Sequence, residues 1–272
     1  MTTGADVIIE AFRREGVEYV FGLPGGAVMP IFDSILDSKI ELILTRHEQG
    51  ATHMADGYAR TTGKTGVVMV TSGPGATNTV TGLLTAHMDS APMVVVSGQQ
   101  ITPMLGKDAF QEADIFGITI PVVKHSYLVK DVNDIPRVMK EAFFIASSGR
   151  PGPVLVDVPK DVASAECVTT FPENLDEHLP GYNFPQMCDM ESIYACADLL
   201  HASKKPLLYV GQGARIAGAA ELVKELAEKI QAPVTTTLLG KGAFPETHLS
   251  LIHISEPTRP LYISYAVFCL KK

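Results

Sequence analysis

The sequence predicts an α/β protein in which a parallel sheet is covered by helices on both faces, giving three layers, followed by the start of a second, Rossmann-like α/β unit. Three observations support this fold class. Short, almost continuously apolar segments alternate with segments of helical periodicity, glycine-rich turns follow several apolar segments, and the alternation resumes after residue 189. Strands buried on both faces read as apolar runs, and alternating strands and helices are typical of parallel sheets.

The first half of the chain supports this prediction element by element. Val7, Ile8, Ala11 and Phe12 recur at helical spacing, and Gly16 ends that helix. Beyond it, apolar runs predict buried strands and amphipathic stretches predict helices. In chain order these are strand 18–21, helix 28–36, strand 40–44, helix 48–60, strand 67–70, helix 76–88, strand 93–97, helix 135–147 and strand 154–158.

A change in composition predicts a domain boundary. Residues 164–188 contain prolines and acidic residues without a sustained period, which is typical of a linker. The elements expected after it are helix 190–201, strand 206–210, helix 219–230 and strand 234–238. We therefore expect an N-terminal domain over residues 1–163, a linker over 164–188, and an incomplete central domain over 189–248.

The end of the chain departs from this alternation. Residues 249–272 follow no period, and their first six residues, Leu-Ser-Leu-Ile-His-Ile, match the translation of a sequencing-library adapter in one reading frame. We interpret 249–272 as a non-native tail and expect the native protein to be truncated at about His248. A divergent strand and loop is the alternative.

The bulk composition argues against several classes of protein. The 272 residues are 46% hydrophobic and carry a net charge of −8, which indicates a globular core and argues against binding to nucleic acid phosphates. No apolar run reaches the length of about 18 residues that a membrane span needs, and the N-terminus lacks a signal-peptide core. The four cysteines form no Cys-x-x-Cys pair. We expect a cytoplasmic protein without nucleic acid or membrane partners.

Glycine-rich turns follow three of the predicted strands: Pro24-Gly25-Gly26, Ser72-Gly73-Pro74-Gly75 and Gly211-Gln212-Gly213. Glycine lets the backbone approach a ligand closely, and open α/β sheets bind ligands at the carboxyl ends of their strands. Each motif alone is also compatible with an ordinary tight turn. The third motif has Ile216 where a dinucleotide fingerprint has its last glycine.

Glu48 is the most unusual of the candidate residues. It follows the apolar run 40–44, within TRHEQGATHMADGYAR, and a carboxylate at the end of a buried strand carries a desolvation cost. A glutamate favoured by the dipole of a helix start is the ordinary explanation. The expectation that several strand-end loops meet there favours a ligand site instead. These loops are 24–26, 46–50, 72–78 and 97–99.

The ordered motifs resemble a known family. The chain is similar to the large, catalytic subunit of acetolactate synthase (acetohydroxyacid synthase), a thiamine-diphosphate enzyme, from about residue 4 to His248. The matching segments are FGLPGGAVMPIFDSI, RHEQGATHMADGYAR, TSGPGATN, GKDAFQE, SGRPGPVLVDVPKD and YVGQGA. The resemblance implies a pyrimidine-binding domain followed by an FAD-binding domain. It also implies a transferase that decarboxylates pyruvate and joins the product to pyruvate or 2-ketobutyrate, for valine, leucine and isoleucine synthesis.

The resemblance implies roles for individual residues. Glu48 would be catalytic, because its carboxyl group would hydrogen-bond N1′ of the cofactor aminopyrimidine and promote loss of the thiazolium C2 proton. Residues implied to contact thiamine diphosphate are Pro24, Gly25, Gly26, Glu48, Pro74, Asn78 and Gln111. Residues implied to contact FAD are Arg150, Gly211, Gly213, Thr237, Leu238 and Leu239. Phe110 and Lys160 would line the substrate channel, although a solvated lysine is the equal alternative for Lys160.

Further expectations concern the metal site, the protein partners and the alternative functions. The sequence has no Gly-Asp-Gly motif followed by a metal-binding Asn, so we expect the Mg²⁺ site in a missing C-terminal domain and expect the chain as written to be inactive. The family implies a homodimer or higher homo-oligomer and a small regulatory subunit. The segment Gln100–Pro103 departs from the family pattern and leaves inhibitor and substrate preference open. Two alternatives stay open: another thiamine-diphosphate enzyme, such as a 2-keto acid oxidase or an acyl-CoA decarboxylase, or a non-catalytic FAD- or nucleotide-binding module.

Overall fold

The structure, a computed structural model, describes residues 2–175, 179, 181–182 and 188–251. It divides into two compact units, unit 1 (Met1–Phe184) and unit 2 (Pro185–Lys272). The interpretation of 249–272 as a non-native tail falls mainly on residues 252–272, which lie outside the described residues. No helix in the described part of the chain is long and apolar enough to cross a membrane.

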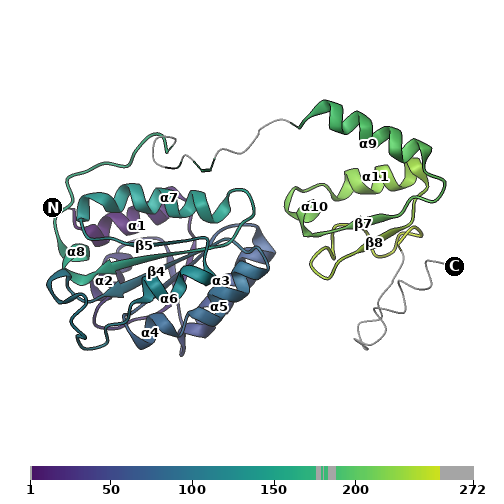
Figure 1. The fold of residues 1–272 in the computed structure, drawn as a ribbon. Helices are drawn as coiled ribbons and strands as arrows, with labels where there is room; N and C mark the ends of the chain where they lie inside the picture. The colour runs from purple at the N-terminus through teal and green to yellow at the C-terminus, as the bar shows by residue number, and fades with distance from the viewer. Residues whose placement is uncertain (1, 176–178, 180, 183–187, 252–272) are drawn as a thin grey trace. The chain divides into compact units, whose positions relative to one another are not determined.

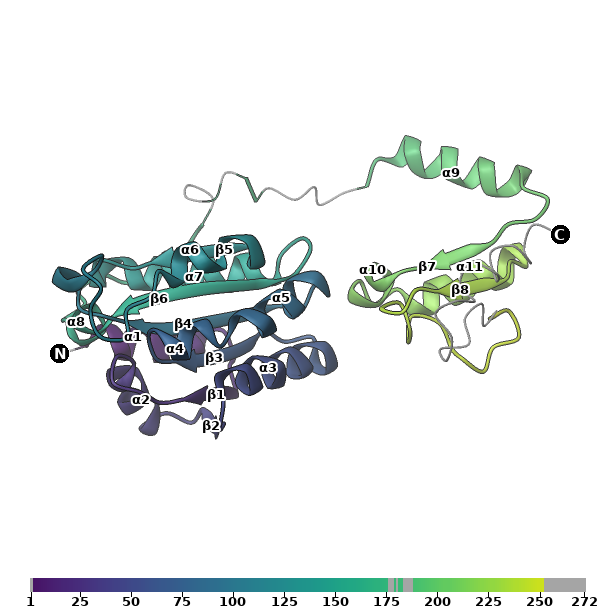
Figure 2. The same cartoon turned by 60° about the horizontal axis from the view of Figure 1, so that its bottom comes forward.

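Unit 1 is built on a six-stranded sheet in the order β2-β1-β3-β4-β6-β5, and every neighbouring pair is parallel. Figure 2 shows the strands stacked from β5 at the top to β2 at the bottom. Because the pairs are parallel, all six carboxyl ends lie at one edge of the sheet, as the α/β prediction requires. The strands are β1 (Tyr19–Leu23), β2 (Glu41–Leu44), β3 (Gly66–Val70), β4 (Met93–Gln99), β5 (His125–Leu128) and β6 (Pro153–Pro159).

Helices cover both faces of this sheet. In Figure 1, α1 and α7 lie above the strands and α3, α4 and α5 lie below them. The α-helices are α1 (Gly4–Arg14), α2 (Met29–Leu36), α3 (Glu48–Thr62), α4 (Pro74–Thr77), α5 (Val80–Met88), α6 (Ile115–Thr119), α7 (Ile135–Ser147) and α8 (Lys160–Ser164). Short 3₁₀ helices cover Thr102–Met104, Ile120–Val122 and Val132–Asp134.

The side chains of β3 show why two helical layers form. Val67 and Met69 belong to the core beneath α1, α2 and α7, whereas Val68 and Val70 belong to the core beneath α3 and α5. Successive strand residues point to opposite faces, so an uninterrupted apolar run fills both cores. The three-layer α/β architecture predicted from the sequence is thus confirmed.

Local signals set the helix boundaries. The Thr3 hydroxyl accepts a hydrogen bond from the Asp6 backbone N–H at 3.2 Å, and the Asp6 carboxylate accepts one from the Thr3 N–H at 2.8 Å, which forms a capping box at the start of α1. Gly63 ends α3 in the left-handed conformation with φ of 74°, where a side chain would be strained.

Two expectations about individual elements were wrong. The strand at 40–44 was predicted to be buried, but β2 is an edge strand and Leu44 is 64% exposed. An edge strand has only one neighbouring strand, so one of its sides is left unpaired. The single helix predicted over 76–88 is two helices, α4 and α5, and between them the Thr79 hydroxyl donates to the Ala76 carbonyl at 2.6 Å.

Unit 2 contains a pair of parallel strands, β7 (Leu208–Val210) and β8 (Val234–Thr236). The helices are α9 (Met190–Ala202), α10 (Gln212–Ile216) and α11 (Ala220–Ile230). Val210, Ala227, Val234, Ala243 and Phe244 form its core. The strands and the two long helices lie within about three residues of their predicted positions.

Candidate functional site

Glu48 lies where the edge strand β2 turns into α3. It is the first residue of that helix, and the His47 imidazole caps the turn by accepting a hydrogen bond from the Gln49 N–H at 3.1 Å. Although Leu44 is exposed, Glu48 itself is only 7% exposed. A carboxylate in the first turn is stabilised by the helix dipole, which offsets part of the cost of its burial.

Asn78 holds one oxygen of this carboxylate. The Asn78 side-chain amide donates to Glu48 Oε2 at 3.0 Å across a separation of 30 residues. The other oxygen, Oε1, lies beside Gly75, where an added Cβ would be 3.2 Å from it. A longer side chain at position 75 would therefore crowd the carboxylate, and glycine keeps that side of Glu48 open.

Thr71 packs the two glycine-rich turns together. A Cβ added at Gly25 would lie 2.5 Å from the Thr71 Cβ, and one added at Gly75 would lie 2.7 Å from the Thr71 Cγ2. The Thr71 hydroxyl also accepts a hydrogen bond from the Ala27 N–H at 3.4 Å. At Gly26, by contrast, an added Cβ would meet nothing within 4 Å. Gly25 and Gly75 are thus required by close packing, while Gly26 borders open space.

Sequence reasoning missed Thr71. It comes directly after the buried strand 67–70 and before Ser72-Gly73, so its position at the strand end could have identified it. Its residue type carries no chemistry by itself, and only the fold shows that both turns pack around it.

Gln111 comes to the same edge of the sheet from a distant part of the chain. Gly73 has φ of 55°, and a Cβ added there would lie 2.5 Å from the Gln111 carbonyl oxygen. Gln111 itself has φ of 54°. The backbone of the DAFQE motif therefore packs directly on the turn that precedes Pro74 and Gly75.

The two residues expected to line a channel are both exposed, and they differ in their place along the sheet edge. Phe110 is 81% exposed. Lys160 is exposed and starts α8 at the end of β6, with β1, β3 and β4 lying between β6 and β2 in the sheet. Pro24 and Pro74 are exposed members of the turns around Thr71. The structure thus gathers Glu48, Asn78, the glycine turns and Gln111, while Lys160 stands elsewhere on the same edge.

Arg150 lies at the opposite edge of the sheet, just before β6 begins. Its guanidinium donates to the Ser90 hydroxyl at 2.8 Å and to the carbonyls of Met88 and His87 at 2.8 and 3.2 Å. These contacts tie the loop after α5 to the loop before β6. The arginine therefore has a structural role within unit 1 that is independent of any ligand.

The candidate FAD residues of unit 2 lie in two adjacent loops. Gly211 and Gly213 follow β7, and residues 237–239 follow the parallel strand β8. The Thr237 N–H donates to the Val210 carbonyl at 3.0 Å. A Cβ added at Gly240, which sequence reasoning missed, would lie 2.4 Å from that same carbonyl oxygen. Both loops therefore meet at the carboxyl ends of the strands, where α/β sheets bind ligands.

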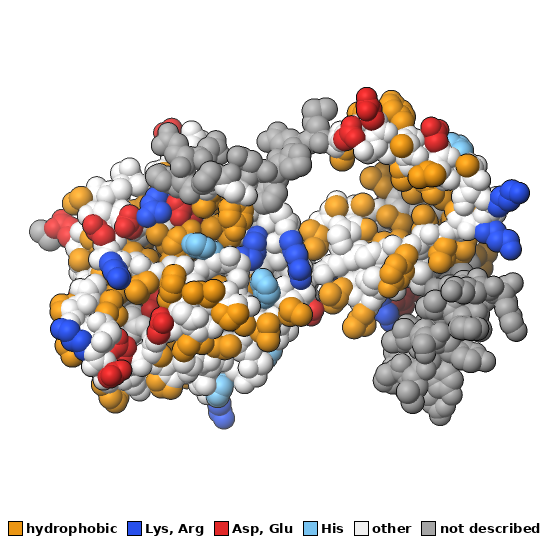
Figure 3. Space-filling model, in the orientation of Figure 1, with side chains coloured by type: hydrophobic (Ala, Val, Ile, Leu, Met, Phe, Trp, Pro, Cys, Tyr) orange, Lys and Arg blue, Asp and Glu red, His pale blue; other side chains and the backbone are white. Residues whose placement is uncertain are grey.

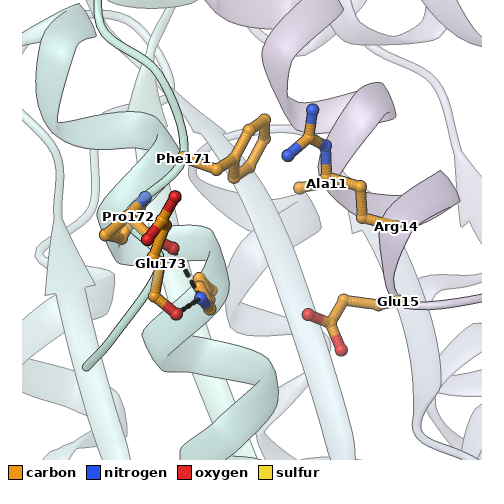
Figure 4. Close-up of a pocket in the computed structure, with 7 residues that line it drawn as sticks. Ala11, Arg14, Glu15, Phe171, Pro172 and Glu173 are labelled. Atoms are coloured by element: carbon orange, nitrogen blue, oxygen red, sulfur yellow. Dashed lines mark hydrogen bonds between the residues drawn. The ribbon is translucent and has the colours of Figure 1, made fainter. Parts of the chain in front are cut away.

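Other features of unit 1 lie away from Glu48. One feature is a cavity of about 380 Å³, whose lining includes Arg14, Phe171 and Glu173 (Figure 4). The Arg14 guanidinium lies 4.3 Å from the centre of the Phe171 ring, and the Lys140 ammonium donates to the Pro172 and Glu173 carbonyls. Desolvation by burial raises the pKa of Glu15, which also lines the cavity. None of the predicted site residues lines this cavity. Among the residues the structure describes, no group of three or more His, Cys, Asp or Glu side chains is arranged to hold a metal ion.

Comparison with known proteins identifies the class to which this fold and site belong. Residues 2–118 match the family described as thiamine pyrophosphate enzyme, N-terminal TPP binding domain, and residues 193–259 match its central domain. The chain belongs to the thiamine pyrophosphate enzymes. The central-domain match extends into residues 249–272, so the interpretation of that segment as non-native stays a prediction.

Within that class, the similar proteins are acetolactate synthases. The chain is 52% identical over 250 residues to the acetolactate synthase of Arthrospira platensis, 51% over 247 residues to that of Mycobacterium bovis, and 50% over 251 residues to the isozyme 3 large subunit of Escherichia coli. These alignments cover 90–91% of this chain but only 40–43% of each relative. The chain thus spans about two fifths of the length of these relatives.

Proposed function

We propose that unit 1 supplies the aminopyrimidine-binding half of a thiamine diphosphate site in an acetolactate synthase. The parent protein would decarboxylate pyruvate and join the product to pyruvate or 2-ketobutyrate. The observation that carries this proposal is the buried Glu48 carboxylate at the carboxyl ends of the strands, held by Asn78 on one oxygen and bordered by Gly75 on the other.

The residues present fit the aminopyrimidine part of this cofactor. A planar ring needs room for close approach, and Gly26 offers open space while Gly75 leaves Glu48 Oε1 uncrowded. A buried carboxylate needs a polar partner, and Oε1 offers an acceptor to a ring nitrogen. Pro24, Gly25, Pro74 and the Gln111 backbone complete the surround in this proposal.

Glu48 hydrogen-bonds N1′ of the aminopyrimidine in this proposal and shares a proton with it. Asn78 keeps the carboxylate oriented by donating to Oε2, so Oε1 is the oxygen that faces the ring nitrogen. In this proposal, the close packing of the two glycine turns on Thr71 keeps water away from Glu48. The hydrogen bond between Glu48 and N1′ is stronger without competing water. Thiamine diphosphate, when bound, supplies the electron sink that decarboxylation of a 2-keto acid requires.

FAD and Mg²⁺ are the further cofactors of the proposal. The Gly211–Gly213 turn and residues 237–239 of unit 2 offer glycine-rich backbone at the ends of two parallel strands, and Leu238 is 82% exposed there. That arrangement is suited to the phosphate-bearing part of a dinucleotide. Arg150 stays a proposed FAD contact from the family resemblance alone, apart from the two loops of unit 2. The Mg²⁺ site belongs, in this proposal, to a part of the parent protein beyond this chain.

Self-association is the partner relationship that the surface of unit 1 supports. Met54 of α3 and Leu84 and Met88 of α5 are exposed by 49%, 43% and 63%. Figure 3 shows hydrophobic side chains exposed over the part of unit 1 that carries α4, α5 and α6. Exposed apolar groups of this kind mark contact surfaces. We infer a homodimer or higher homo-oligomer, together with the small regulatory subunit that a large subunit implies.

The test uses the full-length parent protein with Glu48→Gln and, as a matched control, Glu41→Gln. Both changes remove one carboxylate near β2, but Glu41 is exposed at the start of that strand. Acetolactate formation from pyruvate should fall by at least about a hundredfold in Glu48→Gln, in line with the loss of a positioned proton-transfer group, and stay unchanged in Glu41→Gln. Equal turnover in the two variants would refute the role of Glu48. Formation of acetate in place of acetolactate would identify a 2-keto acid oxidase instead.

A further inference from the structure

Asp157 is a buried carboxyl group that the proposed chemistry does not use. It lies in β6 opposite Ser97 of β4 and is 1% exposed. The Ser97 hydroxyl donates to Oδ1 at 2.6 Å, and the Gln99 amide nitrogen donates to Oδ2 at 2.9 Å. Burial raises its pKa to about 7, against the lowering effect of these two hydrogen bonds. Burying an acid inside an apolar strand costs free energy unless it is hydrogen-bonded, so the partners of Asp157 determine what it contributes to the structure.

Gln99 connects Asp157 to a distant loop. Its amide nitrogen donates a second hydrogen bond to the Ala113 carbonyl at 2.9 Å, and its amide oxygen accepts from the Gln100 N–H at 2.9 Å. Gln99 is buried, so these bonds satisfy the side chain without water. Asp157 presents an acceptor oxygen to Gln99 whether its carboxyl is ionised or neutral. The Gln99 amide nitrogen makes both bonds. The Asp157 acceptor therefore determines that this nitrogen, and not the amide oxygen, faces the Ala113 carbonyl.

The loop that Ala113 ends is closed on itself. We define the 106–113 loop as residues Gly106–Ala113. The Glu112 carboxylate accepts hydrogen bonds from the N–H groups of Gly106 and Ala109 at 2.5 and 2.8 Å, and the Gln100 amide donates to the Phe110 carbonyl at 2.5 Å. A loop with its own internal bonds moves as a body, so its attachments to the rest of unit 1 determine where it lies.

The attachments that reach the loop from outside are the Gln99–Ala113 bond, the Gln100–Phe110 bond and the contact with Gly73. The Gln111 carbonyl packs where Gly73 lacks a side chain, two residues before Gly75 and its neighbour Glu48. A continuous set of contacts therefore runs from Asp157 through Gln99 and Ala113 to the turn beside Glu48.

We propose that Asp157 is a positioning residue: by orienting the Gln99 amide, it holds Ala113 and sets the 106–113 loop against the Gly73 turn. Its importance for thiamine diphosphate binding rests on the proposed function. The positioning itself concerns only the contacts of unit 1.

The test is amide hydrogen exchange in the whole 272-residue chain, compared among wild type, Asp157→Asn, Asp157→Leu and Gln99→Leu. Asparagine keeps both bonds, because its oxygen accepts from Gln99 and its nitrogen donates to the Ser97 hydroxyl. Leucine keeps the volume and removes the acceptor. We expect exchange at Gln100, Gly106 and Ala109 to become at least about tenfold faster in both leucine variants, as loss of one buried hydrogen bond predicts, and to be restored in Asp157→Asn.

Two internal controls separate positioning from general stability. The Thr102 N–H is held by the Asp161 carboxylate at 3.0 Å and should exchange unchanged, as should the amides of β3. Ser97→Ala removes the bond to the other carboxyl oxygen and should leave the loop unaffected. If Asp157→Leu fails to fold, Gln99→Leu tests the same link from the other side.

Two results would overturn the proposal: loop exchange that is unchanged in both leucine variants, or loop exchange that rises only together with exchange in β3. Because no cofactor is needed for this readout, its failure is distinct from failure of the proposed function. That function is judged by acetolactate formation alone.

Discussion

The side-chain amide of Asn78 donates to Glu48 Oε2 at 3.0 Å, although the residues lie on different helices and 30 positions apart. Asn78 caps the four-residue helix α4, and Glu48 opens the fifteen-residue helix α3. The break between α4 and α5 places Asn78 where it can reach the carboxylate. In a continuous helix over 76–88, Asn78 would lie within the helix and not between two helices.

Asn78→Ala should therefore lower the activity that depends on Glu48 more than it lowers the stability of unit 1. The loss of one partly exposed hydrogen bond predicts a decrease of about 1 kcal/mol in the free energy of unfolding of unit 1. In the full-length protein, the freed carboxylate should lower acetolactate formation by about tenfold or more. Urea unfolding and product formation measure the two effects. Thr81→Ala, at an exposed position of α5, is the control and should change neither. Unaltered activity in Asn78→Ala would remove Asn78 from the site.

Gly75→Ala should destabilise unit 1 because its Cβ would lie 2.7 Å from Thr71 Cγ2. We expect a loss of about 1–3 kcal/mol, typical of overpacking. Thr71→Ser removes that methyl group, so the double variant Gly75→Ala/Thr71→Ser should regain most of the loss in a double-mutant cycle. Gly57→Ala is the matched control. It lies within α3 with nothing within 4 Å of its added Cβ, and it should raise stability by about 0.5–1 kcal/mol. If the stability changes of Gly75→Ala and Thr71→Ser simply add in the double variant, contact with the Thr71 methyl group is not the cause of the loss.

The raised pKa of Asp157 predicts a specific pH dependence of stability. Burial raises this pKa from 3.8 to about 7, so between these values the folded state keeps a proton that the unfolded state has lost. The contribution of this group to the free energy of unfolding therefore falls as pH rises from about 4 to about 7, and the cost is fully present above that range. The total is at most about 4 kcal/mol, since each pKa unit corresponds to about 1.4 kcal/mol.

Asp157→Asn tests this dependence because asparagine does not titrate. The difference in free energy of unfolding between Asp157→Asn and wild type should grow in favour of the variant from pH 4 to pH 8. Urea denaturation of both proteins across that range gives the difference directly. A difference that stays constant with pH would show that the carboxyl titrates alike in the folded and unfolded states.

Gly240→Ala should disturb the loop that follows β8. Its Cβ would lie 2.4 Å from the Val210 carbonyl oxygen, a backbone atom that cannot rotate away. We expect unit 2 to lose about 1–3 kcal/mol of stability and the 237–239 loop to shift. Gly213→Ala meets nothing within 4 Å and should leave stability within about 0.5 kcal/mol. Quenching of FAD fluorescence by the two variants then tests the proposed site. A loss of binding in Gly213→Ala with unchanged stability would support contact with the ligand there.

The sequence predicted the parallel sheet well because continuous apolar runs such as Val67–Val70 leave few alternatives to a strand covered on both faces. It failed at β2, where Ile40 to Leu44 has the composition of a buried strand but lies at the edge of the sheet. Strand order depends on which segments pair, and composition does not encode it. The short strand β5 and helix α6 were also missed, because His125-Ser-Tyr-Leu128 carries too little periodicity to stand out.

The sequence pointed to the central carboxylate of the candidate site, Glu48, but it did not reveal the residues that support this carboxylate. Glu48 stood out as a carboxylate beside a strand end, and the glycine turns marked where loops converge. The tertiary pairing of Asn78 with Glu48 and the packing around Thr71 depend on distances that spacing along the chain does not give. Asp157 could have been noticed as an acid within the run Val154–Val158. Its partners, Ser97 and Gln99, follow only from the register of β4 with β6.

The position of β2 at the margin of the sheet has an electrostatic consequence. Leu44 faces solvent on the strand that leads into Glu48, so the local dielectric around the carboxylate depends on whatever comes to cover that margin as well as on unit 1. Any apolar surface placed over Leu44 would lower the dielectric and strengthen the hydrogen bond from Asn78. In an assembly that covered Leu44, the strength of this hydrogen bond would therefore depend on protein concentration.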